Sequence, residues 1–127
     1  MSIQIGDKAP DFTLTTLGAE GPELLTLSEY AAGSKAVLLF DPMAFTGVCT
    51  DEFCSVSEGL GEYESLGAKV IGISGDNPFA LKEWADKNGI KLTLVSDYEH
   101  EVTKAYGVAY NSFLPDKNLP MGGVAKR

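Results

Sequence analysis

The sequence predicts an α/β fold with largely parallel strands, and three observations support this prediction. Apolar runs of strand length recur along the chain, and each one ends at polar or glycine-containing turn residues. Segments with the apolar spacing of a helix lie between them. Runs that are apolar on both faces are typical of strands covered by helices on each side. The length of 127 residues fits one domain, so we expect a single unit.

The expected strands follow from these apolar runs. Residues 3–17, which contain a glycine and a proline, are expected to form short extended pieces. Strands are then predicted at residues 36–40, 69–74 and 92–95. Alternation of such strands with helices predicts a sheet with helices on its faces.

The expected helices lie around these strands. Residues 27–32 are predicted to form a short helix capped by Ser28. A longer helix follows from a stripe of five apolar side chains: Cys49, Phe53, Val56, Leu60 and Tyr63. Gly59 and Gly61 are expected to weaken or bend it. Two further helices are indicated by i, i+3, i+4 apolar positions: Leu81, Trp84 and Ala85, then Val102, Ala105 and Tyr106. Residues 108–127 are expected to form a long loop.

Composition excludes several classes of function. Ten basic and eighteen acidic residues give a net charge of −8, which disfavours binding to nucleic acid or to an anionic membrane surface. No apolar run approaches the roughly 20 residues of a transmembrane helix, and the N-terminus lacks a signal-peptide pattern. We therefore expect a cytoplasmic protein, in which the two cysteines are reduced and serve chemistry. Two cysteines and one histidine, His100, which is expected on the surface, do not make a tetrahedral zinc site.

The most informative segment leads from a predicted strand through a proline turn into a helix. Its first helical turn carries Cys49. A helix N-terminus stabilises a thiolate, which is the nucleophilic form of cysteine. Asp51 and Glu52 oppose this because negative charge raises the pKa of a nearby thiol, so a cation from elsewhere in the chain is required. The alternative is that Cys49 is simply a small buried apolar residue.

The spacing Pro42-x-x-x-Thr46-x-x-Cys49 is similar to the active-site motif of the peroxiredoxins. Phe45 and Glu52 also match its usual surroundings, and the opening residues 6–12, GDKAPDF, resemble the family's N-terminal segment. The order of expected elements agrees with the family as far as Gly107. Within the family, the chain resembles most the bacterioferritin comigratory protein, or peroxiredoxin Q, branch.

The resemblance implies a thioredoxin-like fold, with a central mixed sheet flanked by helices. It implies a thiol-dependent peroxidase that reduces hydrogen peroxide and organic hydroperoxides through a sulfenic acid on Cys49. Thr46 would bind the peroxide, Pro42 would shield the sulfur, and Arg127 would supply the missing cation. Glu52 would position that arginine, with an ordinary helix-start carboxylate as the alternative. No metal or organic cofactor is required.

The resemblance also suggests that Cys54 is the resolving cysteine, with a thioredoxin-like protein as reductant. In an intact helix the two Cα atoms would be roughly 8.7 Å apart, whereas a disulfide needs less than about 7 Å. We therefore expect the first helical turns to unwind after oxidation. The alternative is an ordinary helix residue, with resolution by another thiol.

Relatives in the family continue beyond the position of Arg127 with further strands and a closing helix. Residues 1–127 are therefore expected to form a single thioredoxin-like peroxiredoxin domain that lacks these elements. A fragment, a short natural form, or a second chain or dimer partner that completes the fold would each account for this. Alternative functions are a thiol–disulfide oxidoreductase, which usually has Cys-x-x-Cys spacing, and a fragment without catalytic activity. A copper carrier is disfavoured by the cysteine spacing.

Overall fold

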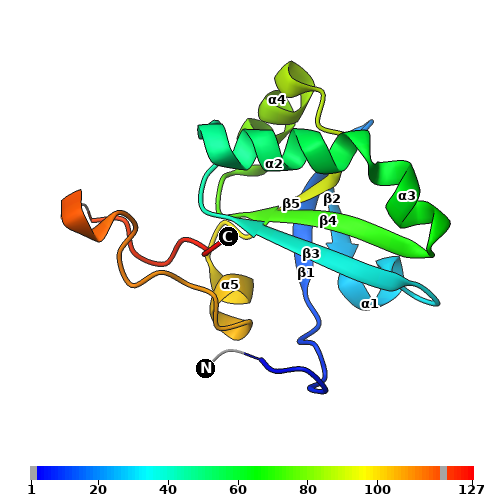
Figure 1. Cartoon of the computed structure of the whole chain (residues 1–127), viewed down its shortest axis with the longest axis horizontal. Coiled ribbons are helices and arrows are strands. Elements are labelled where there is room, and N and C mark those ends of the chain that lie inside the picture. Colours follow the sequence, from blue (N-terminus) through cyan, green and yellow to red (C-terminus); the bar gives the residue numbers. More distant parts are fainter. Residues whose placement is uncertain (1–2, 118–119) are drawn as a thin grey trace.

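A computed structural model describes residues 3–117 and 120–127 of the chain. The fold is a five-stranded sheet with helices on both faces (Figure 1). Its elements, in chain order, are β1 (Thr13–Gly18), β2 (Gly21–Thr26), α1 (Leu27–Tyr30), β3 (Lys35–Asp41), α2 (Gly47–Glu58), α3 (Leu60–Ser65), β4 (Ala68–Ser74), α4 (Pro78–Asn88), β5 (Thr93–Ser96), α5 (Glu101–Ala105) and the 3₁₀ turn η1 (Pro115–Lys117).

The sheet is mixed, with strand order β2-β1-β5-β4-β3. Strands β3, β4 and β5 are parallel, whereas β1 pairs antiparallel with both β2 and β5. The register aligns Asp41 with Ser74 and Ser74 with Ser96. Because parallel strands end at the same edge of a sheet, these three polar residues lie together at the carboxyl edge.

Each face of the sheet carries its own apolar core, as expected for strands that alternate their side chains. In β3, Val37 and Leu39 pack toward α2, α3 and α4, while Leu38 and Phe40 pack toward α1 and α5. Trp84 of α4 is fully buried in the first of these cores. The central strands are therefore apolar on both faces for the reason that the sequence suggested.

The structure confirms the α/β class and the three parallel strands but adds an antiparallel hairpin, β1–β2, where only extended pieces were expected. The long amphipathic segment is divided at Gly59, which caps the end of α2 and precedes α3. Ser28 does not cap α1, because its side chain donates a hydrogen bond to Asp11. None of the helices in residues 3–117 and 120–127 has the length and apolar character needed to cross a membrane.

The C-terminal segment is not a free loop in its last residues. Ala125 forms a β-bridge with Ala109, and backbone hydrogen bonds join Val124 to Tyr110 and Lys126 to Val108. This pairing returns the end of the chain to the carboxyl edge of the sheet (Figure 1). Arg127 thereby reaches the start of α2.

Candidate active site

The turn between β3 and α2 holds the predicted motif. Pro42 is buried directly after β3, and Thr46 is the N-cap residue of α2. The Thr46 hydroxyl does not cap the helix but donates a hydrogen bond of 2.8 Å to the Met43 carbonyl. Phe45 adopts a left-handed backbone conformation with φ 67°, which is uncommon for a residue with a side chain. The hydrogen bond from Thr46 to Met43 therefore stabilises the turn from within.

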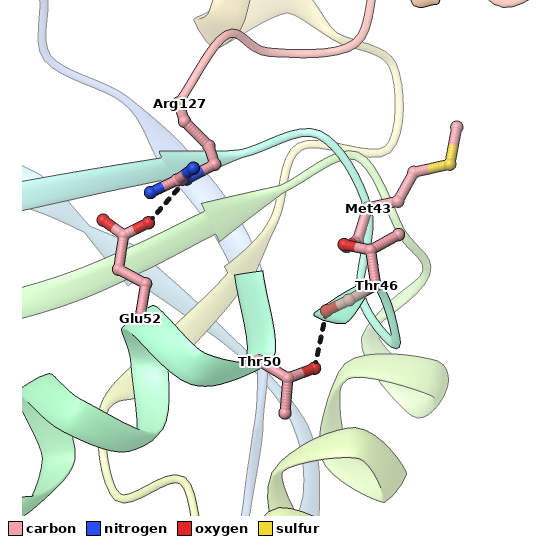
Figure 2. Close-up of polar contacts among 5 residues, drawn as sticks. All are labelled: Met43, Thr46, Thr50, Glu52 and Arg127. Carbon is pink, nitrogen blue, oxygen red and sulfur yellow. Dashed lines mark hydrogen bonds and ion pairs between the residues drawn. The ribbon is translucent and has the colours of Figure 1, made fainter. Parts of the chain in front are cut away.

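Cys49 lies in the first turn of α2 and is 2% exposed. Its neighbour Thr50 donates a hydrogen bond to the Thr46 carbonyl (Figure 2) and accepts one of 2.9 Å from the indole nitrogen of Trp84. These bonds tie the start of α2 to the turn on one side and to α4 on the other. No feature of the sequence indicated this role for Thr50.

The predicted pair of Glu52 and Arg127 is brought together across 75 positions of the chain. Arg127 Nε donates to Glu52 Oε2 at 2.8 Å (Figure 2). Glu52 is one turn along α2 from Val48 and Cys49, so the guanidinium is held over the first turn of the helix. Arg127 lowers the pKa of the Cys49 thiol, as the required cation should.

The pKa of the Cys49 thiol is nevertheless raised overall, whereas a lowered pKa was expected. Burial raises the pKa of the Cys49 thiol above its ordinary value, and the Asp41 carboxyl adds to the rise. Thr46, the Met43 backbone and Arg127 lower this pKa but do not compensate. The arginine that the family resemblance implies lies close enough to lower this pKa, but the sequence did not indicate that burial would outweigh its effect.

Asp41 is the main feature that the sequence interpretation missed, because the strand predicted at residues 36–40 stopped before it and no role was assigned to it. Its side chain is fully buried, and within the described residues neither carboxyl oxygen has a hydrogen-bond partner. Burial, with the nearby charge of Asp76, raises the pKa of Asp41 to about 7. An acidic residue between a buried strand and the motif proline was the only available signal.

Asp76 follows β4 and links this edge of the sheet to the active-site turn. One of its carboxyl oxygens accepts a hydrogen bond of 2.7 Å from the Ala44 backbone and another from the Ser74 hydroxyl. The Asp76 carbonyl accepts a bond from the Ser96 hydroxyl. The sequence had indicated only a turn here.

Cys54 lies further along the same helix and is partly buried against the same apolar core as Cys49. Its thiol donates to the Asn88 carbonyl at 3.3 Å, so it is directed toward the end of α4. Both cysteines are free, and α2 is helical from Gly47 to Glu58. The geometric objection to a direct disulfide therefore applies to this state of the protein.

His100 is not the surface residue that was expected. Its ring packs so tightly on Gly75 that a Cβ there would lie 2.3 Å from it, and its Nδ1 is buried. Among residues 3–117 and 120–127, no group of three or more His, Cys, Asp or Glu side chains is placed to hold a metal ion.

Comparison with known proteins gives this site its context. Residues 5–124 match the AhpC/TSA family, which covers almost the whole chain and the complete motif. The chain belongs to this family, the peroxiredoxins. The predicted family is thus confirmed, together with its thioredoxin-like fold.

Individual peroxiredoxins agree with this assignment. The chain is 36% identical over 115 residues to the 2-cysteine peroxiredoxin of Chattonella marina var. antiqua, covering 85% of this chain and 59% of that protein. It is 35% identical over 108 residues to alkyl hydroperoxide reductase E of Mycobacterium tuberculosis, covering 84% and 69%. The crystal structure of peroxidoxin BcpB from the same organism superposes with a TM-score of 0.77 and 29% identity, covering 86% and 68%. The chain therefore spans 59% of the length of the Chattonella protein.

Proposed function

We propose that the chain is a thiol-dependent peroxidase that reduces hydrogen peroxide and organic hydroperoxides at Cys49. The observation that carries the proposal is the convergence of three elements on one sulfur. The turn after β3 supplies Thr46, the start of α2 supplies Cys49, and the C-terminal segment supplies an arginine held by Glu52. Family membership supports the same chemistry.

The proposed reaction oxidises the sulfur and reduces the peroxide. The Cys49 thiolate attacks one peroxide oxygen, so that an S–O bond forms and the O–O bond breaks. The sulfur becomes a sulfenic acid, and the other oxygen leaves with a proton as water or an alcohol. Arg127 and the Thr46 hydroxyl would stabilise negative charge on the two oxygens, and the buried Pro42 would keep water from the sulfur. Glu52 would act only by positioning Arg127.

Cys54 is the proposed resolving residue, with a thioredoxin-like protein as the reductant. Its place in the same helix supports the proposal only if α2 unwinds, because an intact helix keeps the two sulfurs apart. Unwinding breaks the hydrogen bond between Trp84 and Thr50. The indole of Trp84, the only tryptophan in the chain, is therefore a natural probe of this step.

The remaining parts of the proposal concern location and assembly. A cytoplasmic protein is supported by the two free cysteines. Within the described residues, no strand pairs with the outer edge of β3. We therefore propose a single domain whose β3 edge is covered by a further segment of chain or by a partner chain, since open edges are rarely left unprotected.

The test is a stopped-flow experiment on the reduced 127-residue chain. Mixing with one equivalent of hydrogen peroxide or cumene hydroperoxide should change Trp84 fluorescence in two phases, sulfenic acid formation and then disulfide formation. Cys54→Ser should retain the first phase and lose the second, and dimedone should label its Cys49. Cys49→Ser is the matched control and should show neither phase.

Two outcomes would contradict parts of this proposal. If reduced protein consumes no peroxide faster than Cys49→Ser, the peroxidase function is wrong. If it reduces insulin disulfides instead, the chain is an oxidoreductase of the alternative kind. A lone Cys49 sulfenic acid in the wild-type chain, with no Cys49–Cys54 linkage by peptide mapping, would exclude Cys54 as the resolving residue.

A further inference from the structure

Asp41 is a buried acid at the strand end that leads into the active-site turn, and neither the family motif nor the proposed mechanism uses it. It is the last residue of β3 and directly precedes Pro42. Its side chain is 0% exposed, and both of its oxygens lack a hydrogen-bond partner within the described residues. A buried carboxylate without partners is costly, so such a group either binds a proton or is held in place for a purpose.

Three neighbouring elements place charged or polar groups against Asp41. Asp76, after β4, and Glu52, on α2, both raise the pKa of Asp41 by repulsion. The Ser74 hydroxyl, in register with Asp41 on β4, lowers it, although Ser74 donates its hydrogen bond to Asp76. Among the described residues, the groups that shift the pKa of Asp41 include no positive side chain, and Arg127 is paired with Glu52.

The coupling reaches Cys49 directly. Two charged groups of the described chain shift the pKa of the Cys49 thiol: Asp41 raises it and Arg127 lowers it. The two charges act on the same sulfur, one from the end of β3 and the other from the C-terminal residue. Arg127 remains charged at every physiological pH, whereas Asp41 gains or loses its charge near neutrality.

We propose that Asp41 controls the reactivity of Cys49 through its charge: protonated Asp41 permits the thiolate, and ionised Asp41 holds Cys49 as the thiol. This regulation rests on the proposed role of Cys49 as the reacting thiol. Asp41 acts only through the effect of its charge on Cys49 and does not contact the peroxide.

The proposal has a characteristic consequence for pH dependence. With a single titrating thiol, the logarithm of the thiolate fraction rises with a slope of one below its pKa. Here each step in pH that deprotonates Cys49 also ionises Asp41, which opposes the gain. The slope should therefore fall below one between about pH 6 and pH 8.

The experiment measures the thiolate without using peroxide. In a Cys54→Ser background, the rate of Cys49 alkylation by iodoacetamide is followed from pH 5.5 to 9.5. Asp41→Asn, which preserves shape and removes the charge, should restore a slope of one and raise the rate at pH 8 by roughly threefold to tenfold, as for loss of a like charge near a thiol. Asp51→Asn is the matched control: Asp51 is exposed on the same helix and, contrary to the expectation from the sequence, is not among the groups that shift the pKa of Cys49, so the profile should not change.

His100 packs on Gly75 at this edge of the sheet and is the alternative source of a flattened profile. Asp41→Asn retains His100, which separates the two explanations. A flattened profile that persists in Asp41→Asn would overturn the proposal. So would a wild-type slope of one throughout, which decides the matter even if the variant does not fold.

The outcomes separate this inference from the proposed function. If peroxide fails to react but alkylation follows the expected profiles, the peroxidase function is wrong and the control of Cys49 by Asp41 is supported. If peroxide reacts while Asp41→Asn and Asp51→Asn behave alike, the function is supported and the control is wrong.

Discussion

The stability of this protein should fall as the pH rises through neutrality, because of Asp41. Folding moves the pKa of this carboxyl from its ordinary 3.8 to about 7, with burial as the main cause. Between these values the folded chain holds a proton that the unfolded chain has lost. The folded state is therefore favoured at low pH, and this advantage disappears as the pH rises to about 7.

The size of the effect follows from the displacement of the pKa. From 3.8 to about 7 is about three pH units, and each unit corresponds to about 1.4 kcal/mol, so the full effect is about 4 kcal/mol. About 3 kcal/mol of this falls between pH 5 and pH 8, where most other carboxylates are already ionised. Since a domain is stable by only about 5–15 kcal/mol, the change is readily measured.

The assay is urea unfolding followed by Trp84 fluorescence at pH 5, 6, 7 and 8, under reducing conditions. The wild-type free energy of unfolding should decline by about 3 kcal/mol over this range. Asp41→Asn should decline much less, so that its stability relative to wild type improves with increasing pH. Asp51→Asn, which changes an exposed carboxylate, should follow the wild type. Parallel curves for wild type and Asp41→Asn would refute the reasoning, because the titrating group would then be another one.

Three other substitutions test separate parts of the structure. Glu52→Gln removes the charge that holds Arg127, so we expect the peroxide reaction to slow about tenfold by stopped flow, with a change in unfolding free energy below about 1 kcal/mol because this pair is partly exposed. Gly72→Ala places a Cβ 2.6 Å from the Phe53 ring, and overpacking should cost about 1–3 kcal/mol by urea unfolding. Asp97→Ala leaves three donors at the start of α5 without their acceptor, which should cost about 3 kcal/mol or more and increase hydrogen exchange in the C-terminal segment. Equal exchange in the two proteins would contradict this account of Asp97.

The central strands could be predicted from the sequence because their burial requires only consecutive apolar residues, which are visible in the sequence itself. Strands β3, β4 and β5 are centred on apolar runs, as expected for strands that helices cover on both faces. The hairpin β1–β2 was missed for the converse reason. Its strands are largely half-buried or exposed, with threonines in β1 and the exposed Leu24 in β2, so no alternating pattern marks them. Their strand structure comes from pairing with each other and with β5.

Some features of the site depend on residues close together in the sequence, and others depend on the packing of distant elements. Cys49 at a helix start is a local feature, and Arg127 was identified because it matches a family position. The burial of Cys49 is not local, because it arises from the packing of α2 with α4 and the sheet. The sequence could therefore indicate Arg127 and Glu52 near the sulfur, but neither the buried Asp41 nor the low exposure of Cys49.

The same packing explains why Asp41 matters. A carboxyl group in water near a thiol would be screened and would change the pKa little, whereas in a buried site the interaction is strong. The strand that buries Asp41 ends one residue before the motif proline, so the chain cannot place Cys49 in its enclosed position without also placing Asp41 at the edge of that enclosure. The reactivity of the sulfur is thus set by a fixed positive charge from the end of the chain and a variable negative charge from β3. Glu52 holds the fixed charge at the surface, whereas the variable charge depends on pH through a pKa that burial and Asp76 raise to about 7.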